Sequence, residues 1–110
     1  MAENISGANF ADEVLASDTP VIVDCWAEWC APCHQGAPVL DAIAEERGDS
    51  IKVVKINIDE DPDIASQYGV VSIPTIVLFK DGEPSAAAVG AQPKKMLEES
   101  LGLDGVVLST

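Results

Sequence analysis

The chain has 110 residues, of which 47% are hydrophobic, and a formal net charge of −13. This length suits one domain, expected to span residues 1–110, with a single hydrophobic core. The negative charge argues against nucleic acid and anionic membrane surfaces as partners, because both would repel the chain.

The first residues of the chain carry only a weak signal for secondary structure. Residues 1–8 are mostly polar, so we expect the first edge strand to be short or missing and this segment to be frayed. Phe10, Val14 and Leu15 have the spacing of a short amphipathic helix. Asn9 is a candidate for its N-terminal cap.

A buried strand and a long helix follow. Residues 21–26 are apolar except for Asp24, as in a strand that is covered on both faces. Residues 35–47 repeat apolar side chains on one helical face. Pro38 lies inside this pattern and should kink the helix, and Gly48 should end it.

The second half predicts two further strands, a hairpin and two helices. Asp61 is a candidate cap, Asp81-Gly82 is a strong hairpin signal, and Gly102 should end the last helix. We expect residues 103–110 to form a loose tail. In order, the elements are a strand at 51–58, a helix at 62–67, strands at 75–80 and 85–89, and a helix from Gln92-Pro93.

This order of elements predicts an α/β fold, with a parallel part joined to an antiparallel edge and helices on both faces of the sheet. In open sheets of this kind, functional sites lie at the carboxyl ends of central strands. Cys30 follows the strand at 21–26 and falls at such a place.

Cys30 and Cys33 are separated by Ala31 and Pro32, between that strand and the long helix. This placement is typical of a dithiol redox site. The free N–H groups and the dipole at a helix start favour a thiolate at Cys30, so we expect it to be the nucleophile and the more exposed cysteine. Cys33, one turn later, can close a disulfide with it. With no second cysteine pair and only His34 as histidine, we expect no metal site.

Three neighbours of the dithiol have chemistry of their own. Burial would raise the pKa of Asp24, unless its side chain faces solvent at the end of the strand. Cys25 is expected to be an inert residue of the core. His34 can change its charge near neutral pH and could make the reactivity of Cys30 depend on pH.

Residues 23–33, Val-Asp-Cys-Trp-Ala-Glu-Trp-Cys-Ala-Pro-Cys, resemble the active-site stretch of thioredoxins. The resemblance continues at residues 55–59, 68–70, 73–75 and 79–82, in the order and spacing of that family. It covers nearly the whole chain and implies the thioredoxin fold, with a central mixed β-sheet.

The resemblance also implies roles for individual residues. Asp24 would accept the proton of Cys33, with Lys55 near the buried carboxylate. The Ile73–Pro74 bond would be cis and lie beside the dithiol, with the backbone of Ile73 offered to an extended substrate chain. The remaining expected docking residues are Trp29, Ala31, Pro32 and Gly90. Ala31 stands where thioredoxins usually have glycine, which should stiffen the loop.

The implied activity is the reduction of protein disulfides through a mixed disulfide with Cys30, which Cys33 then resolves. A flavoprotein of the thioredoxin-reductase type, using NADPH, would restore the dithiol, and no cofactor would bind the chain itself. Two other functions remain open. An oxidant or isomerase could use the same dithiol, and a binding subunit could use the fold only for docking.

The expected partners are therefore disulfide-containing proteins and the reductase, with the chain acting as a monomer. The start of the sequence carries no positively charged segment followed by an apolar run, so we expect a cytoplasmic protein. The high negative charge either keeps the surface solvated or steers the chain toward a basic patch on a partner.

Overall fold

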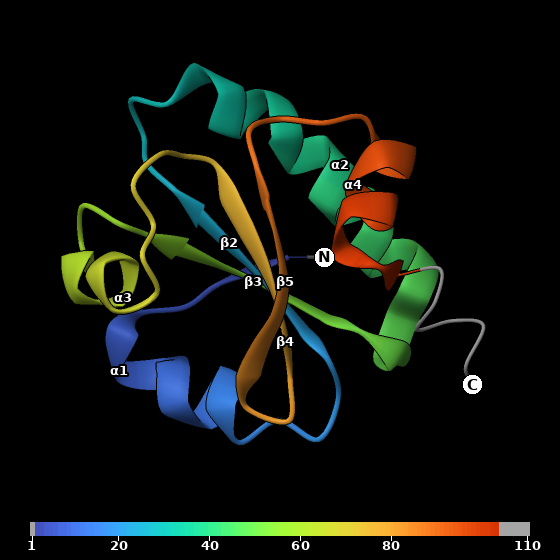
Figure 1. Cartoon of the computed structure of the whole chain (residues 1–110), viewed down its shortest axis with the longest axis horizontal. Helices are drawn as coiled ribbons and strands as arrows, with labels where there is room; N and C mark the ends of the chain where they lie inside the picture. Colours follow the sequence, from blue (N-terminus) through green and yellow to red (C-terminus); the bar gives the residue numbers. More distant parts are fainter. Residues whose placement is uncertain (1, 104–110) are drawn as a thin grey trace.

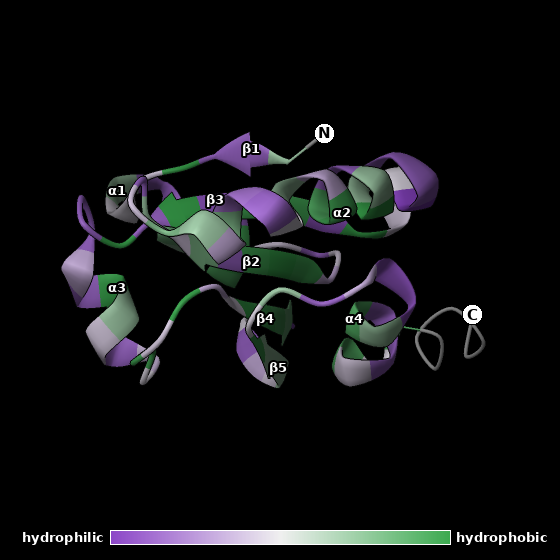
Figure 2. Ribbon diagram, turned by 90° about the horizontal axis from the view of Figure 1, so that it is seen from above, coloured by the Kyte–Doolittle hydropathy of each residue, from purple (hydrophilic) through white to green (hydrophobic). Residues whose placement is uncertain are grey.

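A computed structural model describes residues 2–103, which form a five-stranded sheet with helices on both faces (Figures 1 and 2). The strand order is β1-β3-β2-β4-β5. Strands β1, β2 and β3 are parallel, whereas β4 and β5 are antiparallel to their neighbours. The predicted mixed α/β sheet is therefore confirmed.

The strands are β1 (Glu3–Asn4), β2 (Val21–Trp26), β3 (Lys52–Asn57), β4 (Thr75–Lys80) and β5 (Glu83–Val89). The helices are α1 (Gly7–Phe10), η1 (Ala11–Leu15), α2 (Ala31–Arg47), η2 (Gly48–Ser50), α3 (Pro62–Gln67) and α4 (Lys94–Leu101).

The first edge strand is short, as expected: β1 has two residues and pairs with β3. The helix after it starts at Gly7, with Ser6 rather than Asn9 at the cap position. The cap prediction was wrong because Asn9 is the third residue of the helix, and its side chain points back to Ser6. Its Oδ1 accepts hydrogen bonds from the N–H and the hydroxyl of Ser6. The chain continues as the π-helix η1, in which Val14 is buried and Leu15 is exposed.

Strand β2 lies in the middle of the sheet, between β3 and β4, and has the predicted bounds. Helix α2 starts at Ala31, earlier than the predicted residue 35, because Cys30 caps it and Pro32 fits its first turn. The helix continues through Pro38 and ends at Gly48, whose φ of +53° suits glycine. The chain from β2 to α2 thus holds Cys30 between a central strand and a long helix.

Two apolar clusters fill the spaces between the sheet and its helices. The first lies against α2 and α4, and the second against α1, η1 and α3. The largest side chains of the first cluster are Ile22, Leu40, Ile43, Ile51, Ile76, Leu78, Leu97, Leu101 and Leu103. Those of the second are Phe10, Val14, Val21, Val23, Val54, Ile56, Val77 and Phe79.

The second half of the chain follows the predicted order. Helix α3 has the predicted bounds with Asp61 at its cap position, although the Asp61 side chain makes no capping hydrogen bond. Asp81 and Gly82 both have positive φ values, as a tight hairpin turn between β4 and β5 requires. Helix α4 ends at Gly102. The tail predicted at 103–110 lies outside the described residues except for Leu103, which is buried and so is not loose. No helix within residues 2–103 has the length and apolar character of a membrane span.

Candidate active site

Cys30 and Cys33 form a disulfide at the start of α2, with their Cα atoms 5.3 Å apart. Cys30 is the N-cap residue, and its sulfur accepts a hydrogen bond from the backbone N–H of Cys33 at 3.2 Å. A helix start has N–H groups without helical partners, and here one of them points at sulfur. The same hydrogen bond would stabilise a Cys30 thiolate once the disulfide is reduced.

Both cysteines are buried in this disulfide form. Cys30 is 3% exposed and Cys33 is 4% exposed, so the prediction that Cys30 would be the more exposed is wrong here. The two joined sulfurs pack as a unit with Ala27 into a small apolar cluster, against Ile58 and Ile73. The helix start alone could not predict this, because residues from two other segments cover the sulfurs.

Asp24 lies in β2 and is 1% exposed, which excludes the alternative that it faces solvent. Its Oδ1 has no hydrogen-bond partner within the described structure. Burial raises the pKa of Asp24 from 3.8 to about 6, and the positive charge of Lys55 partly opposes this rise. The sheet register places Lys55 of β3 directly opposite Asp24. The Lys55 ammonium also lies 4.9 Å from the centre of the Trp26 ring.

A small pocket lies between Asp24 and Cys33. Asp24, Cys33, Pro74 and Gln92 are among the residues that line it. Its volume is about 10 Å³, close to the smallest space that can hold one water molecule. Asp24 and Cys33 thus border the same small pocket.

Two loops lie beside the disulfide. The Ile73–Pro74 bond is cis, as expected, and Ile73 packs against the disulfide cluster. The N–H of Gly90 donates to the carbonyl oxygen of Pro74 at 2.8 Å, which brings the end of β5 to the same place. Gly90 has a φ of +91°, and the space where a Cβ would stand is open.

The two tryptophans beside the dithiol have different surroundings. Trp29 is 69% exposed, and its Nε1 donates to Asp59 at 2.8 Å. Trp26 is half-buried and packs against the disulfide cluster, and its ring forms a T-shaped pair with the His34 ring. Nε2 of His34 lies 2.7 Å from the carbonyl oxygen of Glu28. The structure thus places Asp24, Ile73 and Pro74 beside the cysteines and Lys55 opposite Asp24. Ala31 and Pro32 are exposed at the surface.

Comparisons with known proteins agree with this geometry. A family model described as Thioredoxin matches residues 2–102. The chain belongs to the thioredoxin family. It is 52% identical to "Thioredoxin 1" of Synechococcus elongatus over 101 residues, which cover 92% of this chain and 94% of that protein. It is 54% identical to "Thioredoxin" of Porphyra purpurea over 97 residues, 88% of this chain and 91% of that protein. The chain is a disulfide reductase of the thioredoxin type, with Cys30–Cys33 as its redox-active disulfide.

Asp59 is a residue of this thioredoxin site that the sequence analysis missed. Its carboxylate holds the exposed Trp29 ring through the Nε1 hydrogen bond, and its backbone N–H donates to the Asn57 side chain. A signal was available, because Asp59 follows β3, which is parallel to β2. Residues that follow parallel strands meet at the same edge of the sheet.

Within residues 2–103, Cys25 is the cysteine that forms no disulfide, and it lies buried in the second apolar cluster. Burial, together with the neighbouring Asp24 charge, raises the pKa of the Cys25 thiol to about 12. We expect Cys25→Ala to retain reductase activity and to lower the free energy of unfolding by about 1 kcal/mol, as small truncations in a core do. Thiol labelling of the reduced, folded protein should find Cys30 fast and Cys25 slow. Fast labelling of Cys25 would contradict this.

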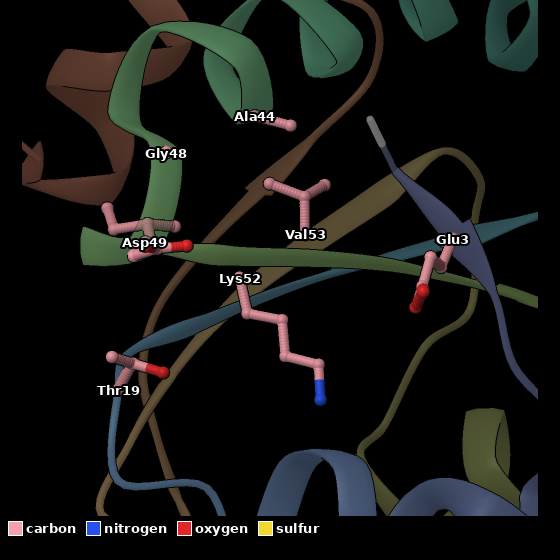
Figure 3. Close-up of a pocket in the computed structure, with 8 residues that line it drawn as sticks. Glu3, Thr19, Ala44, Gly48, Asp49, Lys52 and Val53 are labelled. Carbon is pink, nitrogen blue, oxygen red and sulfur yellow. The ribbon is translucent and has the colours of Figure 1, made fainter.

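A second hollow, of about 330 Å³, lies at the opposite end of the sheet (Figure 3). Residues at the amino ends of β2 and β3 line it, including Thr19 and Lys52, together with Asp49 after α2. Lys52 is held by Glu13, with which it forms an ion pair at 3.2 Å. Because Cys30 follows the carboxyl end of β2, this hollow is not part of the thioredoxin site.

Proposed function

We propose that Cys30 attacks protein disulfides and that Cys33 completes their reduction. The observation that carries this proposal is the hydrogen bond from the Cys33 N–H to the Cys30 sulfur. In the reduced protein, the Cys30 thiolate attacks one sulfur of a substrate disulfide, whose bond breaks as the new S–S bond forms. One substrate sulfur leaves as a thiolate, and the other stays joined to Cys30.

Cys33 resolves this mixed disulfide. Its thiol gives up a proton, and the resulting thiolate attacks the Cys30 sulfur. The second substrate thiolate leaves, the Cys30–Cys33 disulfide forms, and two electrons have passed to the substrate. We assign the proton to Asp24, because its carboxyl group is buried beside Cys33, and the raised pKa makes it a better base near neutral pH. Lys55 would moderate that pKa from the neighbouring strand.

We assign substrate docking to the surface formed by Trp29, Ala31, Pro32, Ile73, Pro74 and Gly90. Trp29 offers a large exposed ring, as interface residues often do. The open space above Gly90 would let a polypeptide come close to the disulfide. The backbone of Ile73 would pair with an extended substrate segment.

The partners in this proposal are disulfide-containing proteins and a flavoprotein reductase of the thioredoxin-reductase type, which would restore the dithiol with electrons from NADPH. We place the activity in the cytoplasm, where thiols are kept reduced and an unpaired residue such as Cys25 is common. In this scheme the protein acts as a monomer.

A coupled assay tests the proposal. The oxidised protein is mixed with NADPH, such a reductase and a disulfide-containing protein, and NADPH consumption is measured. We expect turnover with the native chain and none with Cys30→Ser. Absence of turnover in the native chain would favour a docking role instead. An equilibrium potential of the Cys30–Cys33 pair below roughly −200 mV would favour a reductant over an oxidant.

A further inference from the structure

His34 follows Cys33 near the start of α2, and the mechanism described above gives it no role. Its side chain is exposed, yet two contacts hold its ring in place. Nε2 lies 2.7 Å from the carbonyl oxygen of Glu28. The ring also forms a T-shaped pair with the Trp26 ring, with the two centres 6.0 Å apart. Ordering an exposed side chain costs conformational entropy, and these two contacts offset that cost.

The contact with Glu28 fixes which ring nitrogen of His34 carries a hydrogen. A carbonyl oxygen can only accept a hydrogen bond, so Nε2 must be the donor. The neutral imidazole can carry its single hydrogen on Nε2, and the charged form carries one on each nitrogen. The hydrogen bond to Glu28 therefore needs no charge on His34. A substitution can thus separate the effect of this hydrogen bond from the effect of charge.

His34 binds the chain on both sides of Trp29. Its backbone N–H donates to the carbonyl oxygen of Cys30 at 3.3 Å, and its side chain binds the carbonyl oxygen of Glu28, two residues earlier. The hydrogen bond to Glu28 closes a loop of chain that contains both cysteines. The disulfide closes a smaller loop inside it. The hydrogen bond and the disulfide therefore restrain the same segment.

We propose that His34 is a positioning residue that favours the disulfide over the dithiol, because it holds the segment before Cys30 against the start of α2. Once one of the two loops is closed, closing the other costs less conformational entropy. The hydrogen bond is therefore stronger when the disulfide is present. By reciprocity, the hydrogen bond makes the two thiols form the disulfide more readily. The protein is then a stronger reductant, with a lower reduction potential.

Exchange with glutathione measures this equilibrium. The thiols of Cys30 and Cys33 react with one molecule of oxidised glutathione. Its S–S bond breaks, the Cys30–Cys33 bond forms, and two molecules of reduced glutathione leave with the two electrons and two protons. Acid quench, alkylation of the free thiols and mass spectrometry give the equilibrium constant. The result does not depend on which cysteine attacks a substrate, so failure of this inference would leave the proposed function standing.

Two variants separate the hydrogen-bond donor from the charge. His34→Phe keeps a ring but has no donor, and we expect its constant for disulfide formation to fall about threefold, a part of what one net hydrogen bond contributes. This fall corresponds to a potential higher by roughly 14 mV. His34→Gln carries an uncharged N–H donor on a long side chain, and it should match the native chain. Gln35→Ala is the matched control, because Gln35 is the next residue of α2 and is also exposed; it should cause no shift.

The stability of the two redox forms gives a second readout. In urea unfolding, His34→Phe should destabilise the disulfide form more than the dithiol form, by the same factor of about threefold in the unfolding constant. A purely structural role would destabilise both forms equally and leave the glutathione equilibrium unchanged, and this result would overturn the inference. A shift with His34→Gln as large as that with His34→Phe would also overturn it, because the charge of His34 rather than its N–H would then be responsible.

Discussion

Cys33→Ser should accumulate a covalent adduct between Cys30 and a disulfide-containing substrate. The reduced variant keeps the Cys30 sulfur at the start of α2, where the backbone N–H of residue 33 stabilises a thiolate. It can therefore attack, but residue 33 can no longer displace the substrate. Mixing with a disulfide-containing protein, an acid quench and a non-reducing gel should show an adduct that dithiothreitol removes. We expect reductase turnover to fall by at least 10²-fold, as when a step of covalent catalysis is lost.

Cys30→Ser is the matched control for this trap, since it removes the other sulfur of the same disulfide. We expect neither adduct nor turnover from it. An adduct that forms only with Cys30→Ser would reverse the two roles. An adduct with neither variant would argue against a covalent mechanism. The trap is informative because both cysteines are almost equally buried in the disulfide form, so exposure alone does not identify the nucleophile.

Asp24→Asn should stabilise the fold at neutral pH. The folded protein holds the Asp24 proton up to a pH of about 6, whereas the unfolded chain releases it near 3.8. Stability is therefore lost as the pH rises from 3.8 to about 6, and the full cost of burying the charge remains at pH 7. The difference between these pKa values corresponds to roughly 3 kcal/mol. Asparagine has no such charge, so urea unfolding at pH 7 should show a gain of up to about this size.

The gain should shrink as the pH falls from about 6 and disappear well below pH 3.8, where the carboxyl group is protonated in both folded and unfolded chains. Asp12→Asn is the control, because Asp12 is exposed on η1 and its change should stay within about 0.5 kcal/mol. A gain that does not vary with pH would show that burial of the Asp24 charge is not its cause.

The same variant tests the chemistry of Asp24. If Asp24 accepts the proton of Cys33, Asp24→Asn should slow resolution of the mixed disulfide by about 10²-fold or more, as loss of a positioned base does. Attack by Cys30 should change less. Rapid acid quench during a single turnover measures both steps. If the rate of resolution does not change, Asp24 takes no part in proton transfer, and its burial only destabilises the fold.

The sequence predicted best the bounds of those elements whose signals lie within a few neighbouring residues. The bounds of β2 and β4 were predicted to the residue, because each is a largely apolar run, and the turn residues Asp81-Gly82 mark the end of β4. The start of α2 was missed by four residues, because Cys30 caps the helix with its sulfur, and cysteine is not a usual cap. The cap of α1 was missed because Asn9 and Ser6 are both good capping residues, and local sequence does not choose between them.

The sequence by itself determined that a dithiol lies between a strand and a helix of an α/β fold, because apolar periodicity and turn residues act over a few positions. Only the tertiary structure decided the surroundings of the dithiol. It places Lys55 opposite Asp24 through the sheet register, and it brings Asp59 to Trp29 across thirty positions of sequence. It also covers both sulfurs. These features depend on contacts between distant segments, and no local pattern encodes which segments meet.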